Sequence, residues 1–281
     1  MNILINNVGN DNFTKTITLK ILNQMKTLKY IAFAVLTTSL ISSCKKDDPE
    51  PVMVHDNPAT YGSLMVRFEN KFGNSALVLN SKNYLNNSDT FKVTKFNYYI
   101  SNVKLTATDN SVYTETESYH LVNADDVNSL SFILSNIPAK SFSSITFMIG
   151  VDSTRNVSGA QTGALDPNNG NFWAWNSGYI MAKMEGTSPQ STAVGKGILY
   201  HVGGFTGTNN VLKTITLPFT TNANVSASKT PQVFLKADLA EWFTPNNISF
   251  ATLHTIHMPG ANAKIVADNY ANMFSVTQVL N

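Results

Sequence analysis

The chain of 281 residues contains one cysteine, Cys44, so it cannot form an intramolecular disulfide or supply a cluster of thiolate ligands. No Cys-x-x-Cys-His motif occurs, which excludes a covalently attached c-type haem. The sequence also lacks a Gly-x-Ser-x-Gly elbow, a His-Glu-x-x-His pair and a phosphate-binding glycine loop. The paired carboxylates Glu115 and Glu117 lie in a polar stretch and are expected to be solvated. We therefore expect a protein that is not an enzyme.

Charged residues are also scarce, at 14% of the chain, and their balance changes along it. Four of the 20 Lys and Arg residues and one of the 18 Asp and Glu residues precede Cys44. The remainder therefore carries 16 basic against 17 acidic residues, a net charge of −1 in place of the +2 of the whole chain. A nucleic-acid partner requires a basic face, so this balance argues against one.

No apolar run is long enough to cross a bilayer, which takes about 20 residues. The run from Tyr30 to Ile41 has about a dozen and follows Lys26 and Lys29, as in a secretory signal. Ser42-Ser43-Cys44 then predicts cleavage before a cysteine that becomes lipidated. Residues 1–43 are interpreted as the signal region, with Met25 as the true start. The alternative is an ordinary leader followed by a free cysteine.

Residues 44–60 are predicted to be the lipidated cysteine and a flexible tether. Lys45-Lys46-Asp47-Asp48-Pro49-Glu50-Pro51 is charged and contains proline, so it cannot bury itself. Lys followed by paired acidic residues resembles the export signal of Bacteroidetes surface lipoproteins. We expect a cell-envelope protein anchored in the outer membrane through Cys44, facing the periplasm or exposed at the surface. The alternative is a plain linker without an address.

Residues 61–281 are predicted to form one all-β, mainly antiparallel, sandwich-like domain with long loops and one or two short helices. Gly, Asn, Ser and Thr are frequent, and short runs alternate apolar and polar residues. The predicted strands are Leu64 to Phe68, Phe91 to Leu105, Ser143 to Gly150, Val211 to Leu217 and Gln232 to Leu239. Turn residues separate them at 86–89, 108–110 and 166–170.

Two segments favour helix. Apolar residues recur at helical spacing near the end of the chain, at Ala263, Val266, Ala267, Tyr270 and Phe274. Asp238 to Phe243 is predicted to form a single turn.

Aromatic residues concentrate in Phe172-Trp173-Ala174-Trp175-Asn176-Ser177-Gly178-Tyr179. On a strand, Trp173 and Trp175 would project to the same face and form a broad aromatic surface. The competing interpretation is a pair of core tryptophans packed between sheets.

At these residues the chain resembles the MbnP-like copper-binding proteins, in what looks like their Bacteroidetes lipoprotein branch. The resemblance is carried by the order and spacing of five segments: 96–102, 118–122, 150–152, 172–179 and 200–204. It implies extracytoplasmic copper handling, in which a histidine pair binds Cu(I) and an oxidised tryptophan, a kynurenine, completes the site. It also implies a partner, a diheme peroxidase of the MauG type, that oxidises Trp173 or Trp175.

The resemblance selects the candidate copper ligands. His201 occupies the family's His-Val-Gly segment and is the first choice, and His120 in Ser-Tyr-His-Leu-Val is the second. His257, with His254 and the thioether of Met258 nearby, is a third candidate. After Asn156, where the family's copper-handling branch has His, this chain has Val157. The site is then rebuilt with His120 or His257, or this branch no longer binds copper.

Two other interpretations stay open at this point. Asp152, Asn156 and Asp166 supply oxygen ligands for Ca²⁺, although such residues are also usual in turns. The rival to copper handling is a surface glycan or nutrient-binding module without metal, in which Trp173, Trp175 and Tyr179 stack on a sugar ring.

Overall fold

Alternating residues on long strands form the framework of the structure, which was obtained as a computed structural model and describes residues 60–176 and 178–281. The predicted signal region, Cys44 and the tether lie outside the described residues. Strand predictions at 64–68, 91–105, 143–150 and 232–239 are confirmed, and 211–217 is confirmed from Lys213 onward. Within the described part of the chain, no helix has the length and apolar character needed to cross a membrane.

The fifteen strands among the described residues are β1 (Tyr61–Phe72), β2 (Ser75–Ala76), β3 (Asn83–Asn86), β4 (Asp89–Ala107), β5 (Val112–Thr114), β6 (Tyr119–Asn123), β7 (Ser131–Pro138), β8 (Ser141–Ile149), β9 (Phe172–Trp173), β10 (Gly178–Thr187), β11 (Gly197–Gly203), β12 (Lys213–Asn224), β13 (Gln232–Asp238), β14 (Thr255–Ile256) and β15 (Phe274–Leu280). The helices are α2 (Ser153–Asn156) and α3 (Ala261–Tyr270), with short 3₁₀ turns η1 (Val127–Leu130), η2 (Gly163–Leu165), η3 (Pro167–Asn169), η4 (Val194–Lys196), η5 (Gly207–Asn209) and η6 (Leu239–Phe243).

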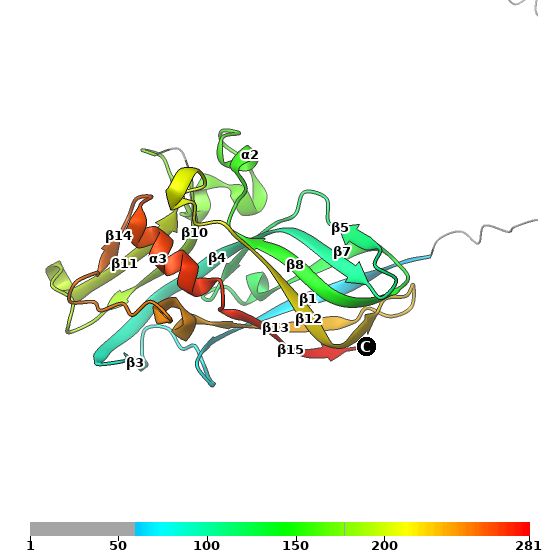
Figure 1. Ribbon diagram of the computed structural model, residues 1–281, viewed down its shortest axis with the longest axis horizontal. Coiled ribbons are helices and arrows are strands. Elements are labelled where there is room, and N and C mark those ends of the chain that lie inside the picture. Colours follow the sequence, from blue (N-terminus) through cyan, green and yellow to red (C-terminus); the bar gives the residue numbers. More distant parts are fainter. Residues whose placement is uncertain (1–59, 177) are drawn as a thin grey trace, which may run out of the picture. The chain divides into compact units, whose positions relative to one another are not determined.

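Two sheets pack face to face. The five-stranded sheet has the order β15-β13-β1-β2, with β7 paired to β1, and its β1–β13 pair is parallel. The ten-stranded sheet has the order β12-β8-β4-β10-β11-β14, with the short strands β3, β5, β6 and β9 attached to β4 and β10. Most pairs are antiparallel, as predicted, and Figure 1 shows β4, β8, β10 and β12 as the long strands of this sheet.

Aromatic side chains fill the space between the sheets. Phe274 of β15 contacts Phe68 on its own sheet and both Tyr98 and Phe147 on the other. Trp242 of η6 packs edge-on against Phe96 and is itself fully buried. We call the side of the ten-stranded sheet that carries Phe96 and Tyr98 its inner face and the opposite side its outer face. Large rings such as these supply much of the apolar burial that stabilises a sandwich.

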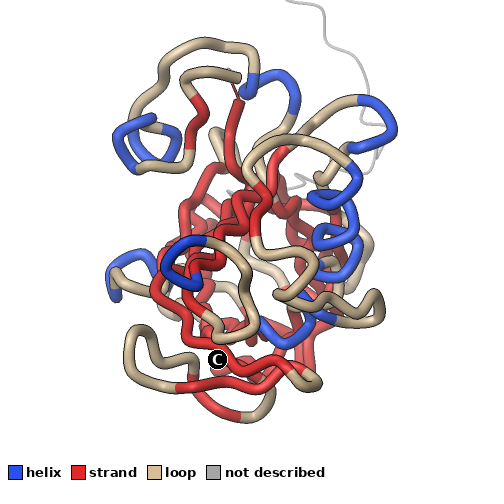
Figure 2. Tube along the Cα trace, turned by 90° about the vertical axis from the view of Figure 1, so that its left-hand side faces the viewer, coloured by secondary structure: helices blue, strands red, loops and turns tan. Residues whose placement is uncertain are grey.

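The outer face of the ten-stranded sheet is covered by chain from α2 to β9. Tyr99 of β4 donates a hydrogen bond to the carbonyl of Ala164 at 3.0 Å, and Tyr179 donates to that of Leu165 at 2.6 Å. In Figure 1 this segment stands above the strands, beside α2, and Figure 2 shows the same loops and short helices gathered at one end of the strand core. This covering segment, residues 153–176, carries the tryptophan pair.

Candidate functional site

The two tryptophans differ sharply in exposure. β9 ends at Trp173, so Trp175 lies in the turn before β10 and not on a strand. Trp173 is 5% exposed and Trp175 is 62% exposed. Their ring centroids are 5.6 Å apart with the ring planes tilted by 42°. The prediction that both project from one strand face is wrong, because the hairpin turns before the second ring. The pair is instead a buried ring in contact with an open one.

Trp173 packs against β11 beside the first-choice ligand. A Cβ atom at Gly203 would lie 2.5 Å from Cζ3 of Trp173, so the indole occupies the space that a side chain at Gly203 would need. Side chains alternate along a strand, so Gly203 and His201 are on the same side of β11. The structure therefore brings Trp173 and His201 to neighbouring positions on the outer face.

His201 is held by a carboxylate. Its Nε2 lies 2.7 Å from Oε1 of Glu185 on the adjacent strand β10. This hydrogen bond is the main reason why the pKa of Glu185 lies below its usual value. A histidine that uses one ring nitrogen for a carboxylate is fixed in orientation and presents the other nitrogen, which is the arrangement common among metal-binding histidines.

His257 comes next to His201 through the edge strand. β14 runs parallel to β11, with Leu199 beside Thr255 and Tyr200 beside Ile256. Further along, a Cβ atom on Gly204 would lie 3.1 Å from Cβ of Pro259. These two contacts bracket His257 at the register position beside His201. Of the two alternatives for rebuilding the site, the register favours His257.

His120 is on the other side of the sheet. It pairs in register with Ile100, which shares the inner face with Tyr98, whereas His201 pairs with Lys183 and so with Asn97 on the outer face. The imidazole of His120 stacks on Phe132 with centroids 3.5 Å apart, and its Nε2 lies 2.9 Å from Oε2 of Glu115. His120 and His201 therefore cannot share one metal ion.

Two of the carboxylates differ from expectation. Glu115 was predicted to be solvated but is largely buried, because it accepts hydrogen bonds from Ser118 and contacts His120. Glu117 is exposed at its side chain, yet it forms an ion pair with Arg155. Both acidic groups bind neighbouring side chains.

The donor set around His201 is small. Over residues 60–176 and 178–281, no three or more His, Cys, Asp or Glu side chains are grouped so as to hold a metal ion. Zinc sites take three or four protein ligands, and calcium takes six to eight oxygens. A pair of imidazoles fits copper better than either, since imidazole suits copper and a low coordination number is what this corner offers. His254 is oriented elsewhere, with Nδ1 3.4 Å from the hydroxyl of Thr192.

Two buried polar side chains fasten the Trp173 strand to the sheet. Lys183 of β10 is 4% exposed, and its ammonium donates a hydrogen bond to the carbonyl of Gly170. Asn171 is fully buried and donates to Oδ1 of Asn97 at 3.1 Å and to the carbonyl of Ile180 at 3.2 Å. Because Gly170 and Asn171 lead directly into β9, these bonds fix the height of Trp173 above the outer face.

Asn156 ties α2 to the same hairpin. Its Oδ1 accepts a hydrogen bond from the amide of Tyr179 at 2.9 Å, and its Nδ2 donates to the carbonyls of Val151 and Asp152. Val157 follows at the end of α2 and is exposed. The family-like asparagine is therefore a structural link, and its neighbour offers no ligand.

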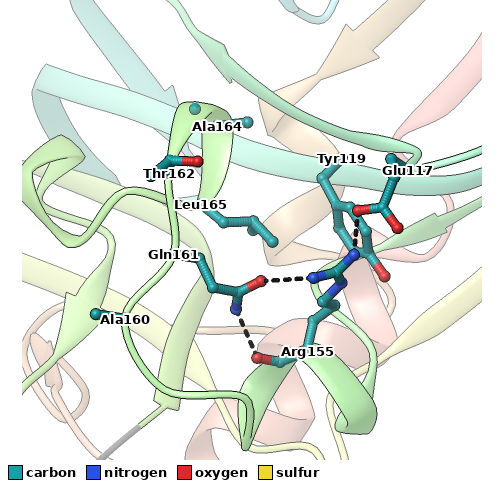
Figure 3. Close-up of a pocket in the computed structure, with 9 residues that line it drawn as sticks. Glu117, Tyr119, Arg155, Ala160, Gln161, Thr162, Ala164 and Leu165 are labelled. Carbon is teal, nitrogen blue, oxygen red and sulfur yellow. Dashed lines mark hydrogen bonds and ion pairs between the residues drawn. The ribbon is translucent and has the colours of Figure 1, made fainter. Parts of the chain in front are cut away.

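A second, polar cavity of about 470 Å³ lies beside α2 (Figure 3). Arg155 lies over the ring of Tyr119, pairs with Glu117 and donates to Gln161 at 3.3 Å. Figure 3 shows these groups turned toward one another across the cavity. Its polar side chains thus satisfy each other.

Asp152, a residue of the calcium interpretation, supports this cavity from behind. It accepts a 2.5 Å hydrogen bond from Tyr119 and caps α2 through the amide of Arg155. Asn156 is engaged as described above, and Asp166 caps η3. These three residues act as caps and ties, which agrees with their usual role in turns.

The glycan interpretation loses two of its three rings. Tyr179 is 1% exposed and Trp173 nearly as buried, so only Trp175 offers a face to solvent. A sugar ring could not stack on all three.

Sequence reasoning overlooked Lys183 and Glu185, which surround His201. A lysine inside the apolar run Ile180-Met181-Ala182-Lys183-Met184 was the available signal, since buried lysine is rare. Their relation to His201 depends on strand register, which the sequence does not show.

The fold and this corner together define a β-sandwich protein with an aromatic hairpin folded over a histidine-bearing sheet edge. The family model for MbnP matches residues 61–259, and the chain belongs to that family. A solved structure described as MbnP from Methylosinus trichosporium is similar at 13% identity and a TM-score of 0.48, covering 68% of this chain and 80% of that one. No curated protein matches the chain. The family membership fits a copper-related protein outside the cytoplasm.

Proposed function

We propose that this protein is a non-enzymatic, lipid-anchored copper-binding protein of the cell envelope, with His201 and His257 as its copper ligands. The observation that carries the proposal is the meeting of His201, the position of His257 and Trp173 at one corner of a domain of the MbnP family. Bound copper would supply a redox-active centre beside the tryptophan pair.

Each residue has a distinct role in this proposal. Glu185 orients the imidazole of His201 through the 2.7 Å contact. His257 lies on the exposed edge segment, where it leaves the site open to incoming metal. Trp173 closes the corner toward Gly203, and Cys44, in the segment that precedes the domain, supplies the anchor.

The tryptophan pair suits a partner that removes electrons. Trp175 is exposed and lies 5.6 Å from Trp173 between ring centroids, so an oxidising protein docked at the hairpin reaches the buried ring through the open one. A peroxide-using diheme enzyme of the MauG type is the proposed partner. Trp173 is the candidate for oxidation nearest His201, and Trp175 is the alternative.

A Cu(I) titration of the purified protein tests the copper half, with three single variants. His201→Ala and His257→Ala are each expected to weaken Cu(I) binding at least tenfold, because each removes one of two ligands. His120→Ala is the matched control and is expected to leave the affinity unchanged, because His120 lies on the inner face. Absence of Cu(I) binding by the unaltered protein, or equal loss in all three variants, would contradict the proposal.

Intact-mass analysis tests the partner half. After co-expression with a MauG-type diheme peroxidase, we expect a mass change that maps to Trp173 or Trp175. An unchanged mass with an active peroxidase would count against the partner while leaving the copper result in place.

A further inference from the structure

Lys183 is an unusual residue for its position. It is 4% exposed, and it is the one lysine among the buried polar residues of the described chain. Burying an ammonium group is costly unless the group is paired, and here its hydrogen bond goes to a neutral carbonyl, that of Gly170. Burial accordingly lowers the pKa of Lys183. A hydrophobic or neutral side chain would fit such a site at less cost, so the positive charge calls for an explanation.

The charge lies directly beside the proposed copper ligand. Lys183 is the register partner of His201 on β11 and of Asn97 on β4, so the three residues form a row across the outer face. Directly opposed residues on antiparallel strands have Cβ atoms about 5 Å apart. The stem of Lys183 therefore starts next to that of His201, and its ammonium ends under the loop that carries Trp173.

The charge also acts on the group that orients His201. The pKa of Glu185 is lowered first by its hydrogen bond with His201, and then by the charges of His201, Lys95 and Lys183. The corner therefore holds one carboxylate, a buried ammonium and two imidazoles. The buried charge is shielded from solvent, unlike that of Lys95, which is exposed.

We propose that Lys183 sets the charge selectivity of this site, disfavouring divalent ions at His201 and so favouring Cu(I) over Cu(II) and Zn²⁺. The inference rests on the proposed copper function. A fixed positive charge repels a bound ion in proportion to the charge of that ion, so it penalises a divalent ion about twice as much as a monovalent one. At a separation of about 7 Å and an effective dielectric constant of about 20, the difference amounts to roughly ten- to fiftyfold in relative affinity.

The test compares metal preference in the unaltered protein and in Lys183→Gln, which removes the charge and keeps a donor for the carbonyl of Gly170. We expect the ratio of Zn²⁺ affinity to Cu(I) affinity to rise at least tenfold in the variant. The Cu(II)/Cu(I) reduction potential is expected to fall by about 59 mV for each tenfold change. Neither readout should move if Lys183 only supports the loop.

Lys95→Gln is the matched control. Lys95 lies on β4 opposite Glu185 but is exposed, so solvent screens its charge and the metal preference should change much less. If Lys183→Gln does not fold, as judged by circular dichroism, Lys183→Met serves as the second neutral variant, and Lys183→Arg is expected to retain the preference for Cu(I).

The outcomes separate the two proposals. A folded neutral variant with an unchanged Zn²⁺ to Cu(I) ratio and an unchanged potential would overturn the role of Lys183 while leaving copper binding intact. An unaltered protein that binds no Cu(I) would overturn both. An equal shift in Lys95→Gln would show that the effect is one of general surface charge, which also contradicts the proposal.

Discussion

At the scale of single residues, Gly203 determines how closely the aromatic hairpin approaches the sheet. It has no side chain at the point where the Trp173 ring meets β11, and a Cβ atom there would lie 2.5 Å from that ring and 2.9 Å from the carbonyl oxygen of Tyr179. Neither neighbour can yield easily, because Trp173 is buried and Tyr179 is held by Asn156. A larger residue must therefore lift the hairpin.

We expect Gly203→Ala to lower the free energy of unfolding by about 1–3 kcal/mol, as overpacking in a core does. It should also change the near-ultraviolet circular dichroism of the tryptophans. Gly197→Ala, at the other end of the same strand, is the control: its nearest neighbouring atom is 3.8 Å away, so we expect little or no change. Equal stability of the two variants in urea denaturation would show that Trp173 does not pack there.

Residue types were easier to infer from the sequence than their grouping. The pattern indicated His120, His201 and His257 as candidates and placed the first two on strands. It could not show that His120 and His201 face opposite sides, since that follows from which residue of β4 meets which residue of β6 and β10. A shift of one residue in register would reverse the result.

At the scale of elements, α2 connects the polar cavity to the tryptophan hairpin. Asp152 caps the helix, accepts the hydroxyl of Tyr119 and receives a hydrogen bond from Asn102 at 3.3 Å. Asn156, at the end of the same helix, holds the amide of Tyr179. A helix of four residues has little stability of its own, so these side-chain bonds maintain it.

The carboxyl of Asp152 makes this link sensitive to acid. Burial acts to raise its pKa, but hydrogen bonds from Tyr119, the Arg155 amide and Asn102 outweigh burial and hold the pKa below its usual value of 3.8. A carboxyl with a lower pKa in the folded state stabilises the fold above the pKa of the unfolded chain, and this contribution is lost as the pH falls through the folded-state pKa.

We therefore expect the unfolding free energy to fall as the pH drops below about 4, and Asp152→Asn to reduce that dependence. At neutral pH the same variant should be about 1 kcal/mol less stable, because it weakens a hydrogen bond to a charged group. Asp125→Asn, at an exposed turn, is the control. Urea denaturation from pH 2 to pH 7 provides the measurement, and parallel curves for Asp152→Asn and the unaltered protein would contradict the expectation.

Elements were predictable where local patterns are strong. The alternation of β1, β4, β8 and β13 and the helical spacing of α3 were all legible in the sequence. The segment 166–170 was predicted as a loop, and it forms the 3₁₀ turn η3, capped by Asp166 and ended by Gly170 in a left-handed conformation. The hairpin at 172–178 was misinterpreted because a two-residue strand leaves no alternation to detect.

At the scale of the whole molecule, the last 22 residues complete the sandwich. The family match ends at residue 259, yet α3 and β15 follow it. β15 pairs with β13 from Gln232–Leu280 to Ala237–Phe274 and forms the edge of the five-stranded sheet. The parallel pairing of β1 with β13 joins chain segments about 165 residues apart, which no local pattern in the sequence could indicate.

Removal of residues 260–281 is therefore expected to abolish folding, even though the family match lies outside the deleted segment. The deletion exposes β13 along one edge and removes Phe274, whose ring contacts Phe68, Tyr98 and Phe147 across the two sheets. Loss of one such buried ring alone costs about 3–5 kcal/mol, a large share of the stability of a typical domain. Removal of only Leu280 and Asn281, which are exposed, should be tolerated. Circular dichroism and limited proteolysis distinguish the two, and a cooperatively folded 1–259 chain would show that the sandwich closes without β15.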